Sequence, residues 1–191
     1  MKKHLSKWTV GLMLAGSLMV ACQDESKPEE SKEVAKEQNE QKFDADSSEE
    51  KSAFAVDAAS GNLAEIKLAK LAIQKSSNKE VKDIATMLET DHTTALGDLK
   101  SIASVKGITL PTDEPDKTKE LITDLSDDKP ADFDKNWVKA LIDKHEKTIS
   151  DYEKALNDLK DEDLKAWITK VLPSIRSHHD KLKAIESSLK K

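Results

Sequence analysis

The chain has 191 residues, of which 36% are charged, and it carries a formal net charge of −6 at neutral pH. This acidic balance argues against a nucleic-acid partner and against attachment to an anionic membrane surface through charge. The single cysteine, Cys22, excludes an internal disulfide bond. There is no glycine-rich phosphate loop and no serine elbow, so hydrolytic catalysis has little support.

Residues 1–21 have the pattern of a signal peptide. A basic start precedes an apolar segment, residues 8–20, that is too short to span a membrane comfortably. The following Ala21-Cys22 resembles the end of the lipobox of bacterial lipoproteins, in which the cysteine is lipidated and becomes the first residue. The sequence therefore predicts a lipid anchor at Cys22 in the cell envelope, at the outer membrane, on its periplasmic or surface face. An ordinary secretory signal with a chance cysteine is the alternative.

Residues 22–47 are predicted to be the lipidated cysteine followed by a disordered acidic tether. Glu, Lys, Gln, Ser and Asp dominate this segment, so it has few apolar side chains to offset the entropy lost on ordering. We therefore expect it to be dispensable for folding. Removal of the signal, with its three lysines, lowers the formal net charge to −9. The lipid on Cys22, not surface charge, is thus the expected link to the membrane, and no protein partner is indicated.

Residues 48–191 are predicted to form one helical domain. Apolar side chains recur at three- and four-residue steps in four long segments, and no segment has the alternation typical of a strand. The expected helices are residues 49–77, 79–106, 133–159 and 162–189. Asn78, Asp132 and Asp161 are good N-caps for the last three of these helices, and Gly107 is a good stop for the second.

The lengths of the connections indicate how these helices pack. The short break at residues 76–78 makes the first two helices an antiparallel hairpin. The connection at residues 107–131 is long enough to cross the length of a bundle, and residues 118–125 within it are predicted to form a short helix. The predicted fold is all-α: a ferritin-like four-helix bundle with a long connection between its second and third helices.

Scattered motifs between residues 52 and 189 resemble domain-of-unknown-function family 4142, a family of bacterial exported proteins often labelled as outer-membrane proteins. The motifs are Ala58-Ala59-Ser60-Gly61-Asn62, Glu65, Asn78-Lys79-Glu80-Val81-Lys82, Asp91-His92-Thr93, Lys106-Gly107-Ile108-Thr109-Leu110-Pro111, Phe133-Asp134, His145-Glu146, and Leu172-Pro173 with His178. The resemblance implies a ferritin-like fold. It implies no agreed biochemical activity.

One ionisable side chain lies near the middle of each long helix, within its apolar stripe: Glu65, His92, His145 and His178. At 1.5 Å per residue these positions have similar depths, so antiparallel helices would bring them to one level. Three imidazoles and a carboxylate are a suitable ligand set for one divalent transition-metal ion. Glu89 and Asp91 flank His92 and are predicted as further ligands or as acceptors behind the ligands. His179, next to His178, is expected to be exposed.

The sequence is therefore compatible with two functions. In the first, a lipid-anchored envelope protein binds a metal ion or small ligand in this Glu/His layer, in stress or metal handling. In the second, the protein is a non-catalytic envelope interaction module whose layer is a structural hydrogen-bond network. A redox enzyme is a third alternative. The di-iron pattern requires Glu-x-x-His on two helices, whereas Ile142 and Ile175 precede His145 and His178 at the glutamate position. The sequence thus favours binding over catalysis.

Overall fold

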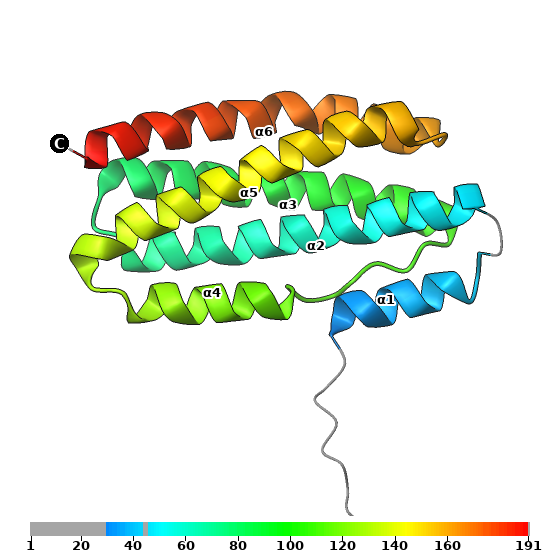
Figure 1. The fold of residues 1–191 in the computed structure, drawn as a ribbon, viewed down its shortest axis with the longest axis horizontal. Coiled ribbons are helices and arrows are strands. Elements are labelled where there is room, and N and C mark those ends of the chain that lie inside the picture. The colour runs from blue at the N-terminus through cyan, green and yellow to red at the C-terminus, as the bar shows by residue number, and fades with distance from the viewer. Residues whose placement is uncertain (1–29, 44–45, 191) are drawn as a thin grey trace, which may run out of the picture.

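The computed structural model describes residues 30–43 and 46–190, and every regular element within them is an α-helix. These helices are α1 (Ser31–Glu40), α2 (Asp46–Lys75), α3 (Lys79–Lys106), α4 (Asp116–Asp127), α5 (Pro130–Asp158) and α6 (Glu162–Leu189). The four long helices lie alongside one another, with the shorter α1 and α4 against one side (Figure 1). The prediction of an all-α fold is confirmed. The predicted signal peptide and Cys22 lie outside the described residues.

Local capping explains why α3 and α6 have the predicted limits. The side chain of Asn78 accepts hydrogen bonds from the first turn of α3, and Gly107 ends that helix in the left-handed conformation, with φ of 69°. Asp161 accepts a hydrogen bond from the first turn of α6 in the same way as Asn78. These contacts join residues close in sequence, so they can be recognised without knowledge of the fold.

The start of α5 differs from the prediction. This helix begins at Pro130, after Lys129, and not at residue 133 after an Asp132 cap. Proline suits the first turn because its φ is already helical and its missing N–H would have no partner there. The other differences are small: α2 begins and ends two or three residues early, and α4 extends the expected 118–125 helix at both ends.

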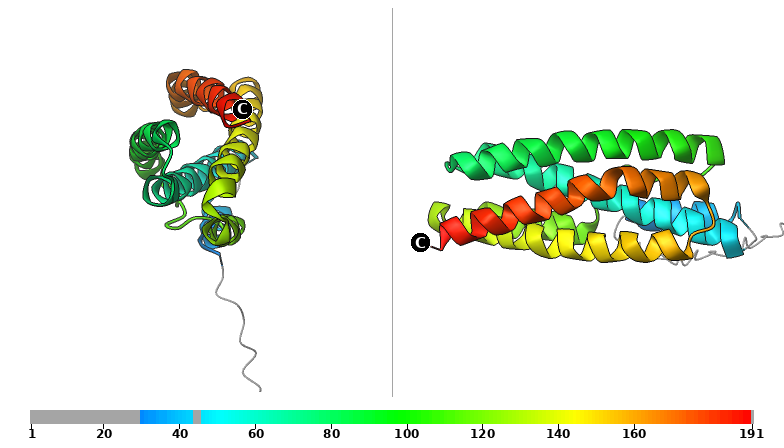
Figure 2. Two further views of the ribbon diagram at one scale, coloured as in Figure 1. Left: turned by 90° about the vertical axis from the view of Figure 1, so that its left-hand side faces the viewer. Right: turned by 90° about the horizontal axis from the view of Figure 1, so that it is seen from above.

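The long helices form two close pairs, α2 with α3 and α5 with α6, and the pairs meet along the α3–α6 and α2–α5 seams (Figure 2). Two apolar clusters fill the interior between them. One includes Ala55, Leu99, Leu164 and Trp167, and the other includes Leu68, Leu88, Trp137 and Leu182. On every long helix, the predicted polar residue lies between the segment that joins the first cluster and the segment that joins the second. The Glu/His layer therefore divides the core.

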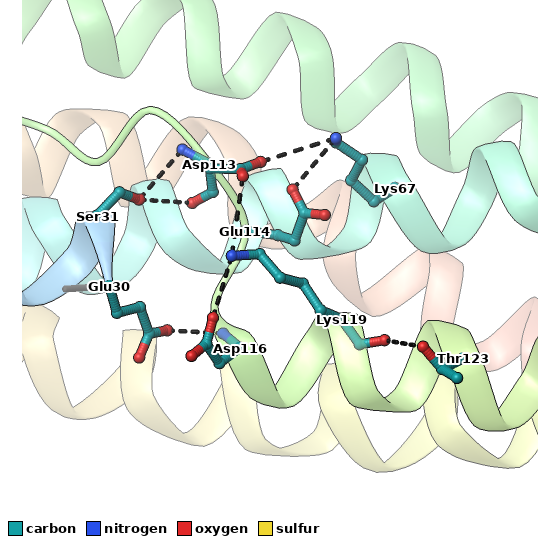
Figure 3. Close-up of polar contacts among 8 residues, drawn as sticks. All are labelled: Glu30, Ser31, Lys67, Asp113, Glu114, Asp116, Lys119 and Thr123. Atoms are coloured by element: carbon teal, nitrogen blue, oxygen red, sulfur yellow. Dashed lines mark hydrogen bonds and ion pairs between the residues drawn. The ribbon is translucent and has the colours of Figure 1, made fainter. Parts of the chain in front are cut away.

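Residues 31–40 correct the predicted tether. They form α1, which packs on α2, and Asn39 in this helix is only 2% exposed. The Asn39 amide makes a two-way contact with the backbone of Thr109, donating to its oxygen at 2.8 Å and accepting from its N–H at 2.8 Å. The hydroxyl of Ser31 likewise donates to the backbone oxygen of Asp113 and accepts from its N–H (Figure 3). The polar composition of this segment misled the prediction, because polar side chains hold it in place.

The same part of the α3–α4 connection is also tied to α2. The Lys67 ammonium lies 3.2 Å from the Glu114 carboxylate and 3.7 Å from that of Asp113 (Figure 3). Glu30, just before α1, accepts the backbone N–H of Asp116 at 2.8 Å. Helix α1, the connection and α2 therefore form one hydrogen-bonded unit.

We expect Asn39→Ala to lower the free energy of unfolding by about 1–3 kcal/mol, because it leaves the N–H and C=O of Thr109 without their partner. Urea unfolding of the variant and the wild type measures this difference. Gln41→Ala, at an exposed site on the same segment, serves as control and should stay within about 0.5 kcal/mol of the wild type. Equal stability of the Asn39 and Gln41 variants would show that α1 contributes nothing to folding, as the tether prediction assumed.

Candidate metal centre

Three histidines from three helices meet in the layer that divides the core. His92 of α3 is 7% exposed, and His145 of α5 and His178 of α6 are each 1% exposed. The ring centroids form a nearly equilateral triangle, with sides of 5.7 Å between His92 and His145 and 5.6 Å for the other two pairs. One ring nitrogen from each histidine lies within 4.8 Å of those of the other two. The predicted convergence of the imidazoles is therefore present.

One nitrogen of each ring is held by an acceptor. His145 Nδ1 lies 2.9 Å from the backbone oxygen of Leu141, and His178 Nε2 lies 2.9 Å from the Asp91 carboxylate. His92 Nδ1 lies 3.0 Å from Oδ1 of Asn62, whose amide nitrogen in turn donates to a backbone oxygen. Since all three partners accept, each of these nitrogens carries the proton. In a neutral ring the lone pair is then on the other nitrogen.

Those other nitrogens have no hydrogen-bond partner among the described residues. They are Nε2 of His92, Nε2 of His145 and Nδ1 of His178, and all three are buried. Buried polar atoms in folded proteins are nearly always paired, so three unpaired lone pairs on neighbouring rings need an explanation. A bound cation would satisfy all of them at once.

The three predicted carboxylates have different positions. Glu65 is 5% exposed and its Oε1 lies 3.7 Å from Nδ1 of His145, on the side of the ring that carries the proton. It is not among the residues whose ligand atoms converge with the triad, although its Oε2 is also unpaired. Asp91 was predicted as a ligand or as an acceptor behind a ligand; in the structure it accepts from His178. Glu89 instead points to Lys70, 3.7 Å away, and takes no part in the layer.

The chain was compared with known families and proteins. The family model described as Domain of unknown function (DUF4142) matches residues 36–185. The chain belongs to this family. The match covers α2 to α5 completely and all three histidines, and it confirms the resemblance drawn from the sequence motifs. No curated protein and no solved structure matches the chain.

Burial favours the neutral form of His92 and His178 in the DUF4142 domain. Burial lowers the pKa of His92 well below its usual value, and the neighbouring His145 and His178 lower it further. Burial also lowers the pKa of His178, although its hydrogen bond to Asp91 acts in the opposite sense. The pKa of Glu65 is raised, chiefly by burial, with His145 opposing the change. Neutral imidazole is the form that coordinates metal ions.

These shifts make the stability of the metal-free domain depend on pH. Below about pH 6.5 unfolded histidines take up protons that folded His92 and His178 do not take up. The free energy of unfolding therefore decreases as the pH is lowered. We expect a loss of roughly 1–3 kcal/mol between pH 7.5 and 5.5, since each histidine contributes at most about 1.4 kcal/mol per pH unit. Glu65, whose pKa is raised, acts in the opposite sense and offsets part of the loss. Urea unfolding at several pH values should show a shallower dependence for His92→Gln. Identical slopes would contradict this account.

Two clefts reach the layer along the two seams of the DUF4142 domain. The α3–α6 cleft has a volume of about 140 Å³, and His92 and His178 lie in its wall. The α2–α5 cleft, of about 280 Å³, is lined by Glu65 and His92. Asn62, His92, Tyr152 and Ile175 line both clefts. His145 lines neither of them, so it is the innermost member of the triad.

The sequence prediction missed some residues of the site and gave others a smaller role. Asn62, which orients His92, was noticed only as part of a family motif, although a buried polar residue one turn before Glu65 is itself a signal. Tyr152 and Trp167 were not among the predicted site residues. They are buried, with exposed fractions of 6% and 3%, and they form walls of the α3–α6 cleft. His179 is less exposed than predicted, and its Nε2 lies 3.1 Å from Glu146, outside the triad.

Proposed function

We propose that the triad of His92, His145 and His178 binds one divalent transition-metal ion. The observation that carries this proposal is the set of three buried ring nitrogens whose lone pairs have no partner. The acceptors behind the rings fix the tautomers, as the outer hydrogen bonds of metal-bound histidines do. Imidazole ligands suit zinc, copper, iron and nickel, so the metal is one of this group.

The size of the triangle supports the same proposal. With sides of 5.6–5.7 Å, its centre lies about 3.2 Å from each ring centroid. A metal ion bound to an imidazole nitrogen at about 2.0–2.1 Å lies about 3.2 Å from the centroid of that ring. The ring centroids are therefore at the distance that a shared metal ion requires.

The second candidate is a structural polar layer in an interaction module. Such a network would gain its stability by pairing the buried groups with one another. The unpaired atoms on all three rings, together with Glu65 Oε2, argue against it. A screen of zinc, copper, iron, manganese and nickel ions against the chelator-stripped protein separates the two candidates. The metal proposal requires that at least one ion raise the melting temperature, and it fails if none does.

We further propose that the four long helices form a ferritin-like four-helix bundle. Its support is the pairing of α2 with α3 and of α5 with α6, together with the long α3–α5 connection that contains α4. Bundles of this kind build metal sites in their cores from side chains on facing helices. The position of the triad, between two apolar clusters, agrees with that design.

The envelope location rests on the sequence, in which an apolar segment ends at Ala21-Cys22. Within the described part of the chain, no helix is both long and apolar enough to cross a membrane. A lipid on Cys22 is the proposed attachment, which would make the protein a metal-binding or metal-handling lipoprotein of the bacterial envelope.

Cys22→Ala should move the protein from the membrane fraction to the soluble envelope fraction. The reason is that no other acyl attachment site is indicated, and the acidic surface does not favour anionic lipids. Fractionation of cells that express the variant and the wild type, combined with fatty-acid labelling, measures the change. Membrane pelleting and lipid labelling that persist in the variant would overturn the anchor proposal.

A further inference from the structure

The α3–α6 cleft gives the histidine triad access to solvent from one side. His92 and His178 lie in its wall, whereas His145 lies behind them in the core. A metal ion held by the three rings would thus have His145 on its inner side and the cleft on its outer side. Among the described residues no fourth histidine, cysteine, aspartate or glutamate places a ligand atom within the converging set. Zinc and related ions take at least four ligands, so one coordination position would remain for an exogenous group.

The charge of the site indicates which kind of group this is. Three neutral imidazoles supply no negative charge to a divalent ion, and the Asp91 carboxylate behind His178 can balance only one of its two positive charges in this nearly buried position. The carboxylates in the cleft wall are already engaged: Asp91 accepts from His178, and Asp98 pairs with Lys170 at 2.7 Å. An anion that enters the cleft would meet no competing free carboxylate there.

The shape of the cleft limits the size of that anion. Its volume of about 140 Å³ is similar to that of an engineered cavity of about 150 Å³ that takes up benzene. Trp167, Val171 and Ile175 supply apolar walls, and Asn62 and Tyr152 supply polar groups near His92. Because the cleft is open to solvent, this volume limits only the part of a ligand that lies inside it, to about six non-hydrogen atoms.

We infer that the metal ion of the triad keeps an open coordination position facing the α3–α6 cleft, and that this position takes a small anion such as an inorganic anion or a short carboxylate. This inference rests on the proposed metal binding. The open position is a further claim than metal binding, because a closed structural site with the same three histidines would have its fourth position filled by the protein. Among the described carboxylates with a buried unpaired oxygen, Glu65 is the one that lies beside the triad, on the α2–α5 side.

Cobalt(II) with azide as the probe tests the inference on the full mature protein. Cobalt first reports metal binding through its visible absorption, and failure to bind defeats the proposed function itself. Azide is then titrated into the cobalt-loaded protein. A saturable spectral change, with one azide per metal, is expected for the wild type. A cobalt site that binds but does not respond to azide would overturn the open position while leaving the metal proposal intact.

Two variants assign the position within the site. If Glu65 fills the fourth coordination position, only the Glu65→Gln variant will respond to azide, and the inference is wrong. An azide response of similar strength in the wild type and in Glu65→Gln supports the inference.

Ala95→Phe places a ring in the wall of the α3–α6 cleft and should weaken azide binding at least about tenfold, with the azide-free cobalt spectrum unchanged. Ser104→Phe, on an exposed part of the same helix, is the matched control. Equal azide affinity in both phenylalanine variants would show that the anion does not enter through this cleft.

Discussion

His145→Ala is expected to abolish the stabilisation that a bound metal ion gives. An ion that binds only the folded chain stabilises it by about 4 kcal/mol when its free concentration is a thousandfold above Kd. For a domain of this size that corresponds to a rise in melting temperature of about 8–16 °C. His145 carries one of the three unpaired lone pairs and is the innermost residue of the triad, so no solvent-exposed group can replace it. Thermal unfolding with and without the ion measures the effect.

The control is His179→Ala, one residue beyond His178. Its imidazole contacts Glu146 and lies outside the triad, so the metal-induced rise should persist in full. The comparison uses the difference between the metal-bound and metal-free melting temperatures of each variant. A general loss of stability caused by the cavity at position 145 therefore cancels. A rise in the His145 variant equal to that of the control would exclude His145 as a ligand.

Trp137→Ala is expected to cause the largest loss of stability of any single substitution considered. The side chain is fully buried, lies in the apolar cluster between α5 and α2, and its Nε1–H donates to the backbone oxygen of Leu68 at 2.8 Å. Truncation of a buried tryptophan costs about 3–5 kcal/mol through lost burial and the cavity left behind. Trp137→Phe keeps most of the ring volume but loses the hydrogen bond, so its loss should be smaller.

Urea unfolding of both tryptophan variants gives these differences. Val105→Ala, at an exposed position on α3, should leave the free energy of unfolding within about 0.5 kcal/mol of the wild type. A loss below about 1 kcal/mol for Trp137→Ala would mean that α5 does not pack on α2 as described.

The helices could be predicted where their limits depend on nearby residues. Asn78, Gly107 and Asp161 act within one turn, and the limits that they set are those observed. Helix α1 could not be predicted from an apolar stripe, because Asn39 holds it through the backbone of Thr109, a residue 70 positions away. Its Lys, Glu, Gln and Ala content does favour a helix, and that signal was outweighed by the low hydrophobicity.

The sequence predicted which residues of the site lie at one level, but not how their side chains are oriented. Counting residues along each helix placed His92, His145 and His178 at one depth, and the structure brings them together because antiparallel helices share their midpoints. Depth alone does not say which way a side chain turns. Glu65 therefore lies beside His145 instead of within the triad, and Glu89 turns to Lys70. The depth of a residue along its helix also does not show that Asn62 would accept a hydrogen bond from His92, since that contact joins two helices.

The most direct test is the number of metal ions that each chain holds. Chelator-stripped protein would be dialysed against a mixture of zinc, copper, iron, nickel and cobalt ions and analysed for its total metal content. The account predicts one ion per chain for the wild type and none for the variant in which His92, His145 and His178 are all glutamine, with circular dichroism verifying that this variant stays helical. Metal content that is the same in both proteins, whether zero or one, would contradict the proposal that the triad is a metal site.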